Sequence, residues 1–470
     1  MPGCTGHLSP YAQTPPPLFS MGGMGWPSPE GVPTLSRMLK VNPLWLAVFL
    51  AACTQTRVEK KEAPATWYKN VGPLVEQKCG GCHVEGGIAA FPLQTHAQAF
   101  ERRDAILASV QEGHMPPWPP SRDCAQYQDD RSLSAEELAL ITRWVEDGGP
   151  LGDPADAPLS TLPQPAGLSR VDVTLTMPTA YTPQKSPDDY RCFLTDWPYS
   201  DTRYVTGFRA DPGNKGIVHH VIAYLAEPDQ VAEAQELDAQ EPGPGYTCFG
   251  GPGLNGGQLV WLGAWAPGGL GSDYPEGTGL RVAAGSKVIL QVHYNTRNLA
   301  PGPGAPAVTD TTSVAFKVDP SVDKVAFVQP WANAEWFDEK TMHIPAGQAD
   351  VTHAWGTDPT AILSDLTGGV FENDKPITVH SVALHMHTLG VSTRLEIQRP
   401  SGAQECLLDI PRWDFHWQGL YALTEPRVVN PGDSIHLECH WDNSAPGAVD
   451  VNWGEGTEDE MCLGLFYMTQ

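Results

Sequence analysis

The chain after residue 170 is built from short segments in which apolar and polar residues alternate, and this pattern restricts the fold most strongly. The segments are "VDVTLTM", "RYVTGFRA", "IVHHVIAYL", "KVILQVHYN", "TSVAFKVD", "ITVHSVALHMHTL", "TRLEIQR", "SIHLECHW" and "EMCLGLFYM". Such alternation has the period of a β-strand, whose successive side chains point to opposite faces. Because glycine and proline turns separate the runs, the pattern predicts antiparallel β-sandwiches. The break "NLAPGPGAPAVTD" near 298–310 divides them into two halves, 171–310 and 311–470, each near the usual domain size.

Residues 67–149 have a helical pattern instead. Apolar residues recur three and four positions apart through "VGPLVEQKCGGCH" and "THAQAFERRDAILASVQEG". The stretch "SLSAEELALITRWVEDGGP" predicts a helix with Ser134 as its N-cap and Glu137 completing a capping box. A linker rich in proline, alanine and glycine follows at 150–170. The expected fold is therefore multidomain, with a small all-α domain ahead of two antiparallel β-sandwich domains.

The N-terminal stretch "RMLKVNPLWLAVFLAACTQ" has the order of an export signal. Basic residues precede an apolar run from Pro43 to Ala52, which is too short to span a bilayer as a helix. The Leu-Ala-Ala-Cys sequence that ends at Cys53 resembles a bacterial lipobox, which would make Cys53 the lipidated first residue. The alternative is an ordinary cleaved signal peptide in which this cysteine occurs by chance.

These features predict an exported bacterial protein, located in the periplasm or at the cell surface and attached to the membrane only through lipid at Cys53. Residues 1–53 are interpreted as the signal and lipobox region and residues 54–66 as a charged tether. If translation begins at Met38, residues 1–37 are not part of the protein.

The charge and the cysteines fit export. The formal net charge of -26 argues against a nucleic acid or an anionic membrane surface as partner. In an exported protein, cysteines outside special motifs are expected to form disulfides. Six cysteines are candidates, and the sequence alone leaves their pairing open: Cys124, Cys192, Cys248, Cys406, Cys439 and Cys462.

The helical region contains a heme-attachment motif. Cys79 and Cys82, followed by His83, form Cys-x-x-Cys-His, in which two thiols bind the heme vinyl groups and the histidine ligates iron. We expect Met115, in "GHMPPWPP", to be the distal ligand, because a thioether raises the heme potential; His114 is the alternative. A redox thiol pair or half of a zinc site would use the same two cysteines. The region resembles a small monoheme cytochrome c with covalent heme c.

Each β half also carries its own set of soft metal ligands. The first set is His219, His220 and His293; the second is His385, His387 and Met461. His385 and His387 are two residues apart, so a strand places both rings on one face, whereas His219 and His220 need a local distortion or a strand end to converge. Three imidazoles suit copper or zinc, and two imidazoles with a thioether favour Cu(I). A single methionine such as Met461 is more often a core-packing residue than a metal ligand. A single histidine such as His293 is likewise more often a hydrogen-bonded interior residue.

Together these residues carry a specific resemblance. Region 171–470 resembles the copper type II, ascorbate-dependent monooxygenases, the family of peptidylglycine α-hydroxylating monooxygenase and dopamine β-monooxygenase. The matching words are "HH" at 219–220, "GAWAPGG" at 263–269, "LQVHY" at 290–294, "HMHTLG" at 385–390, "PGD" at 431–433 and "EMC" at 460–462. The resemblance implies two jelly-roll-like copper β-sandwich domains that face a solvent-filled cleft.

The resemblance also implies roles for these residues. It assigns His219, His220 and His293 to an electron-storing copper, and His385, His387 and Met461 to the copper at which dioxygen and substrate react. It implies disulfides between Cys439 and Cys462 and between Cys192 and Cys248. It does not settle the pairing of Cys124 and Cys406.

The implied activity is hydroxylation of a C–H bond of a small organic substrate with O2, with two copper ions and an external reductant, ascorbate or a redox protein. The peptide-hydroxylating branch binds a peptide carboxylate with an arginine and a tyrosine, and Ala383 and Leu465 stand at those positions. A less acidic, aromatic or apolar substrate therefore fits better. We further expect the heme at His83 to relay electrons to the first copper. The alternative function is a non-enzymatic exported lipoprotein that transfers electrons or binds copper.

Overall fold

The computed structural model describes residues 64–85, 89–158, 167–255, 259–267, 269–296, 308–338 and 340–470. The predicted signal and lipobox region, with Cys53, lies outside these residues, as does nearly all of the tether. All of these described residues belong to one compact unit. Within the described part, none of the helices has the length and apolar character needed to cross a membrane.

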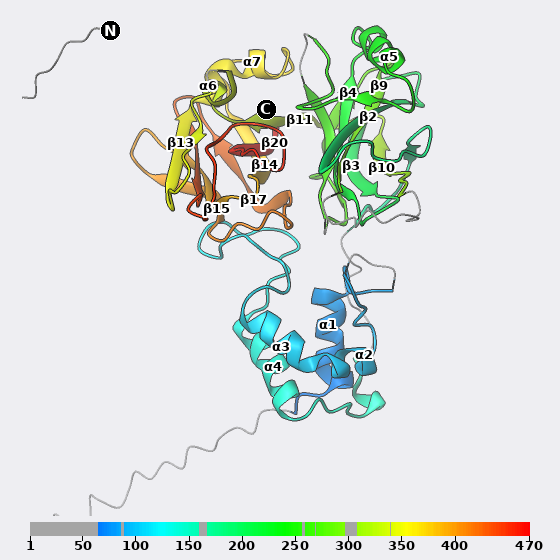
Figure 1. Ribbon diagram of the computed structural model, residues 1–470, viewed down its shortest axis with the longest axis vertical. Helices are drawn as coiled ribbons and strands as arrows, with labels where there is room; N and C mark the ends of the chain where they lie inside the picture. The colour runs from blue at the N-terminus through cyan, green and yellow to red at the C-terminus, as the bar shows by residue number, and fades with distance from the viewer. Residues whose placement is uncertain are drawn as a thin grey trace, which may run out of the picture. The chain divides into compact units, whose positions relative to one another are not determined.

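The helical region contains four α-helices and one π-helical turn within the described residues (Figure 1). They are η1 (Trp67–Val71), α1 (Gly72–Cys79), α2 (His96–Glu101), α3 (Arg103–Gln111) and α4 (Ala135–Glu146). The side chain of Ser134 accepts a hydrogen bond from Glu137 N, and the Glu137 carboxylate accepts one from Ser134 N, which confirms the predicted capping box. Trp67 and Trp144 are buried in the core of this region.

The first β half has strands of the predicted kind. They are β1 (Val173–Thr176), β2 (Asp188–Asp196), β3 (Arg203–Asp211), β4 (Val218–Ala226), β5 (Tyr246–Thr247), β6 (Val260–Trp265), β7 (Ser272–Asp273), β8 (Thr278–Val282) and β9 (Lys287–Asn295), with helix α5 (Val231–Gln240). One sheet has the order β5-β2-β9-β4-β6. It packs against β1, β3 and β8 through a core that includes Val221, Leu290 and Leu280. Strand β10 (Ser313–Asp319) pairs with β1 and β3.

The second β half repeats this two-layer plan. Its elements are β11 (Lys324–Trp331), α6 (Ala334–Asp338), β12 (His343–Ile344), β13 (Val351–Thr357), α7 (Leu363–Leu366), β14 (Ile377–His385), β15 (Gly390–Gln398), β16 (Gln404–Ile410), β17 (Tyr421–Val429), β18 (Ser434–Trp441), β19 (Val451–Asn452) and β20 (Leu463–Thr469). A sheet of order β13-β18-β15-β16 faces β11-β20-β14-β17. Leu395, Leu437 and Phe466 lie in the core between them.

The two halves share one sheet. Strands β8 and β11 pair in parallel, with Lys324 opposite Thr278, so that the order β1-β10-β3-β8-β11-β20-β14-β17 runs without a break. Backbone hydrogen bonds between β8 and β11 therefore join the two halves directly.

A segment of the helical region is attached to the second half. Cys124 forms a disulfide with Cys406, 282 residues further along the chain. Tyr127 pairs with Leu423 in an antiparallel bridge, and Gln128 N donates to the carbonyl of Ala422 at 2.7 Å. In Figure 1 the cyan loop between α3 and α4 reaches the strands of the second half at this place.

Candidate metal centre

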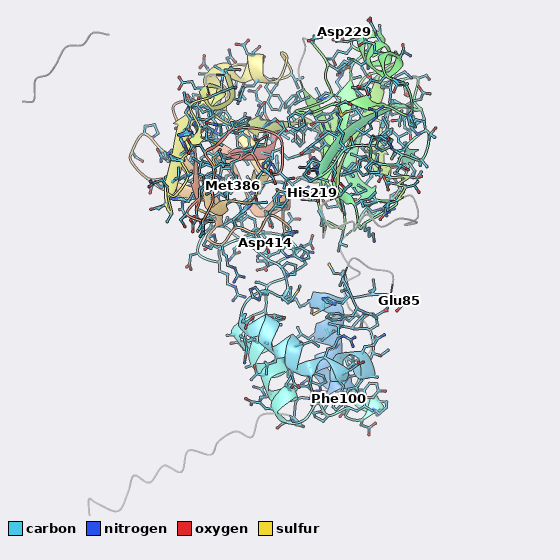
Figure 2. All side chains as sticks on the ribbon, in the orientation of Figure 1. Glu85, Phe100, His219, Asp229, Met386 and Asp414 are labelled. Carbon is cyan, nitrogen blue, oxygen red and sulfur yellow. A yellow bond between two sulfur atoms is a disulfide. The ribbon has the colours of Figure 1, made fainter. Side chains whose placement is uncertain are left out.

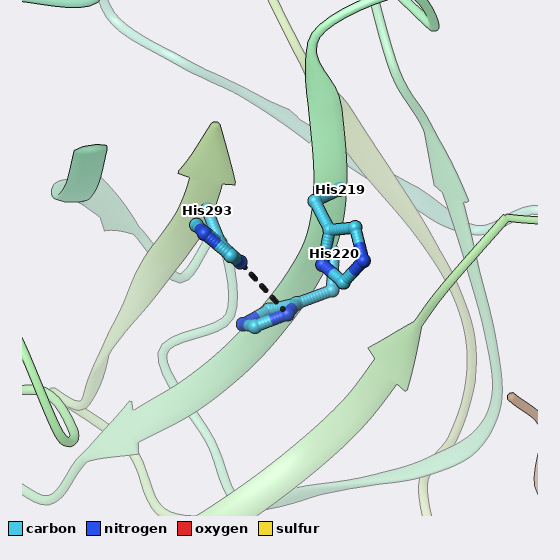
Figure 3. Close-up of side chains that lie close together, drawn as sticks. All are labelled: His219, His220 and His293. Atoms are coloured by element: carbon cyan, nitrogen blue, oxygen red, sulfur yellow. Dashed lines mark hydrogen bonds between the residues drawn. The ribbon is translucent and has the colours of Figure 1, made fainter. Parts of the chain in front are cut away.

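A bulge in strand β4 places His219 and His220 side by side. The pairing of β4 with β9 shifts register between Val218 and His220, so one extra residue is inserted at His219. A bulge of this kind re-aims a side chain that would otherwise point to the opposite face of the sheet. Figure 3 shows both rings extending from β4 toward His293, which lies on β9 opposite His220.

The three rings of this first set come close enough to share one ion. One nitrogen from each of His219, His220 and His293 lies within 4.8 Å of the others. The two Nδ1 atoms of His220 and His293 are 3.4 Å apart (Figure 3). Nitrogen ligands at this mutual spacing suit a small cation such as copper or zinc.

His293 is held by two neighbours. Its Nε2 donates to Oδ1 of Asp188 at 2.9 Å, which leaves Nδ1 free to bind a metal. The ring of Tyr190 stacks on it with centroids 4.0 Å apart. Burial would raise the pKa of Asp188, but hydrogen bonds from His293 and Thr457 hold it at about 2, so this carboxylate stays ionised.

His219 lacks any such partner. Both of its ring nitrogens are buried, and neither has a hydrogen-bond partner among the described residues. Burial and the neighbouring histidines lower its pKa to about 3, so the ring is neutral at pH 7. A buried polar group without a partner is costly unless something binds it. A metal ion at this place would satisfy it, so the residues of the first set fit a copper ion.

The second set lies at the end of strand β14. His385 is the last residue of the strand and His387 follows two residues later, with ring centroids 5.0 Å apart. Nδ1 of His385 donates to Oε1 of Gln418 at 2.5 Å, and Nδ1 of His387 donates to the carbonyl of Asp459 at 2.9 Å. Each hydrogen bond fixes one ring nitrogen and leaves Nε2 free as a metal donor.

Met461 is buried next to a carboxylate that organises this set. Glu460 accepts hydrogen bonds from the backbone of His387 at 2.9 Å, from that of Leu389 at 2.6 Å and from Nε1 of Trp441 at 2.8 Å. The segment that carries Met461 is thereby joined to the histidine segment. Two imidazoles and a thioether, the donor types of His385, His387 and Met461, suit a copper ion; their role as ligands stays a prediction.

All five histidines line one small cavity. Its volume is about 20 Å³, and its other lining residues are Tyr190, Phe415, Glu455 and Thr457. A space of this size holds roughly one water molecule. The space between these nine residues is therefore much narrower than the solvent-filled cleft that the resemblance implies. Figure 2 shows His219 at the boundary between the two halves.

The heme-type motif follows α1 directly. Cys79 is the last residue of α1, and His83 N donates to its carbonyl at 2.9 Å. Cys79 and Cys82 are free thiols, whereas the other six cysteines in the described residues form disulfides. Nδ1 of His83 donates to the carbonyl of Phe91 at 2.9 Å, so its Nε2 is free.

The structure bears out two predicted disulfides and adds a third. Cys192 pairs with Cys248 and Cys439 with Cys462, as expected. Cys124 pairs with Cys406, which sequence reasoning left open. Sequence reasoning also missed four residues that support the histidines: Asp188, Phe415, Gln418 and Glu460. Only Glu460, in "EMC", lies in a word that the sequence singles out; the others stand in no motif.

Two β halves that each bring histidines to one cavity define a candidate copper protein. The description "Copper type II ascorbate-dependent monooxygenase, N-terminal domain" matches residues 173–301, and the corresponding C-terminal domain matches residues 342–469. The two matches together cover more than half of the chain, which therefore belongs to the copper type II ascorbate-dependent monooxygenase family. The predicted likeness of residues 67–149 to a cytochrome c lies outside both matches and stays a prediction.

Curated relatives agree with this assignment. DBH-like monooxygenase protein 1 of Gallus gallus is 26% identical over 265 residues, which cover 54% of this chain and 40% of the relative. Tyramine beta-hydroxylase of Caenorhabditis briggsae is 25% identical over 359 residues, 69% of this chain and 54% of the relative. The chain thus spans about half the length of these relatives. A solved structure of infectious bursal disease virus Gt strain covers 65% of this chain and 80% of its own at 9% identity, with a TM-score of 0.16 that is too low to inform the fold.

Proposed function

We propose that the protein is a copper-dependent monooxygenase that hydroxylates a C–H bond of a small organic substrate with O2. The observation that supports this most is the single cavity lined by His219, His220, His293, His385 and His387. Bound copper would supply one-electron chemistry and the activation of O2. A pair of one-electron metal sites could store the two electrons that the reaction takes from the external reductant, since one oxygen atom of O2 enters the C–H bond and the other leaves as water.

The chain's own residues would hold and orient this chemistry. The first set offers three imidazoles without sulfur, and the second set offers two imidazoles and the thioether of Met461, a donor that favours Cu(I). Asp188 and Gln418 fix the tautomers of His293 and His385 through hydrogen bonds, which keeps one nitrogen of each ring directed at the metal. The cavity leaves room for about one water molecule beside these rings.

The substrate is proposed to be aromatic or apolar rather than a peptide acid. Ala383 and Leu465 lie opposite each other on the adjacent strands β14 and β20. On the same face, two residues along, His385 lies opposite Leu463. The surface beside His385 is thus apolar and has no cation that could bind a carboxylate at these three positions.

Oxygen uptake with isotopically labelled O2 tests the activity directly. The copper-loaded protein with ascorbate would be given tyramine, named in one relative, and para-ethylphenol, which lacks the ammonium group. We expect labelled oxygen in a hydroxylated product, lost in His387→Ala and kept in the control His343→Ala, whose histidine is exposed on β12. If the protein binds two copper ions but forms no product from these probes or from a panel of apolar compounds, the result would support the alternative, a non-enzymatic copper and electron-transfer protein.

We also propose covalent heme c at Cys79 and Cys82, with His83 as the proximal ligand and Met115 as the distal ligand. The free thiols support it, because other cysteines of the described chain are oxidised. Met115 packs against a core cluster that contains Leu74 of α1. His114, the alternative, is exposed and forms an ion pair with Glu112, its Nδ1 lying 3.2 Å from a carboxylate oxygen.

The heme region is proposed to pass electrons to the first histidine set. A methyl group added at Gly81 would lie 3.1 Å from Leu270, so the motif contacts the first β half. The adjoining Gly269 accepts a hydrogen bond from Trp265, which lies opposite Val221, the residue after His220. The route between motif and histidines thus has one packing contact, followed by covalent and hydrogen-bonded links.

Stopped-flow reduction of the bound copper tests the relay. We expect slower reduction by a protein electron donor in Cys79→Ala with Cys82→Ala than in wild type. Direct reduction by ascorbate serves as the control and should be equal in both. Equal rates with the protein donor would remove the relay from the proposal and leave the hydroxylation unaffected.

Export to the periplasm or cell surface with a lipid at Cys53 is part of the proposal, and palmitate labelling of wild type and Cys53→Ala tests it.

A further inference from the structure

The loop between β16 and β17, residues 411–420, carries one aromatic side chain into the histidine cavity. Trp413 anchors the loop by donating from Nε1 to the carbonyl of His387 at 3.0 Å and from its backbone N to the carbonyl of Val391 at 2.7 Å. Gln418 closes it by donating from Nε2 to the carbonyl of Phe415 at 2.8 Å. The loop belongs to the second half, yet Phe415 lines the cavity together with His219 of the first half.

The contact between these two residues is a stack. The rings of Phe415 and His219 have centroids 4.6 Å apart and an interplanar angle of 19°. The edge of His387 lies near the same phenyl ring, at 6.0 Å and 82°. Phe415 thus lies beside a ring of each histidine set.

The stack matters because His219 differs from the other histidines. His293, His385 and His387 each have one ring nitrogen hydrogen-bonded to an oxygen of Asp188, Gln418 or Asp459, which orients the ring. The fourth, His220, has its Nδ1 3.4 Å from Nδ1 of His293. His219 has no hydrogen-bond partner for either nitrogen among the described residues. Packing must therefore define the rotation of its ring, and the stacked phenyl ring is the flat surface available for this.

We propose that Phe415 is a positioning residue for the first histidine set, orienting the ring of His219 in place of a hydrogen bond. This inference rests on the proposed copper function. The metal geometry of the first half then depends on a side chain supplied by the second half. The start of the same loop is held by the helical region, since Arg412 Nη2 donates to the carbonyl of Gly113 at 2.6 Å.

Competition for Cu(I) with a chelator such as bicinchoninate measures the effect. In Phe415→Leu, which keeps an apolar side chain but removes the ring, we expect one copper equivalent to bind about tenfold more weakly and the other to be unchanged. The EPR spectrum of the Cu(II) form should change for that same equivalent. Phe415→Trp and Phe415→Tyr keep a stacking ring and should restore both values.

Two controls make the outcome specific. Leu420→Ala alters an exposed residue of the same loop and should change neither copper affinity nor EPR spectrum. The weakened equivalent should be the one that is missing in His220→Ala. If wild type binds two copper ions and Phe415→Leu retains both affinities and the wild-type spectrum, the inference is wrong while the proposed function stands. If wild type binds fewer than two, the proposed function itself fails.

Discussion

Asp188 and His293 form a hydrogen bond of 2.9 Å between a carboxylate of strand β2 and a ring of strand β9. The same Oδ1 atom accepts a second hydrogen bond, of 2.7 Å, from Oγ1 of Thr457 in the second half. One carboxylate therefore orients a candidate metal ligand and also joins the two halves beside the cavity.

Replacing Asp188 by alanine should weaken metal binding at the first set. Without the acceptor, Nε2 of His293 loses the partner that fixes its tautomer, and loss of such a partner commonly lowers metal affinity about 10–100-fold. Chelator competition should show the loss in one copper equivalent only. Asp229→Ala, at an exposed position before α5, is the matched control. Unchanged affinity in Asp188→Ala would show that the hydrogen bond does not support the site.

The disulfide between Cys124 and Cys406 should contribute strongly to stability, because it closes a very long loop. Replacing both cysteines by serine should lower the free energy of unfolding by about 2–4 kcal/mol, measured in guanidinium chloride. The copper content should not change, since neither residue lines the cavity. A variant as stable as wild type would mean that the backbone hydrogen bonds around Tyr127 suffice to hold the segment.

Glu455 gives a pH dependence with a definite sign. Burial, with repulsion from Asp459, raises its pKa from 4.5 to about 7 in the folded, metal-free protein. Its contribution to stability is therefore fully present below pH 4.5 and is lost as the pH rises to about 7, because the folded state resists ionisation. As the pH rises from 5 to 8, the free energy of unfolding of Glu455→Gln should increase by about 1–3 kcal/mol relative to that of wild type.

Urea unfolding of the metal-free proteins at the two pH values measures this gain. The exposed Glu458→Gln serves as the comparison and should track wild type. An identical difference between Glu455→Gln and wild type at both pH values would contradict the raised pKa.

Met115 and His114 can be separated by the spectrum of the heme-loaded protein. Met115→Ala should convert the heme to a high-spin form and lower its potential, because the thioether ligand is lost. His114→Ala should leave both properties near wild type, since this side chain is exposed. The opposite pattern would make His114 the distal ligand.

The histidine pairs illustrate what the sequence could and could not predict. The strand pattern placed His219 and His220 on a strand and required a local distortion or a strand end, and the structure has a bulge in β4. The bulge itself could not be located, because it depends on the pairing of β4 with β9, a long-range contact. His293 could be assigned only through the resemblance, since a single histidine on a strand has no local signal.

The supporting residues were out of reach for a similar reason. Phe415 belongs to a loop without periodicity, and its role follows from packing against a residue almost two hundred positions earlier. The partner of Cys124 depends on where the helical region docks, which no local pattern encodes. The capping box at Ser134 was predictable because its two hydrogen bonds span three residues.

The most direct test is a copper count by elemental analysis on purified protein and three variants. Wild type should retain two copper ions, His220→Ala and His387→Ala one each, and the double variant none. Fewer than two ions in wild type, or two ions retained in either single variant, would contradict the assignment of a separate copper to each histidine set.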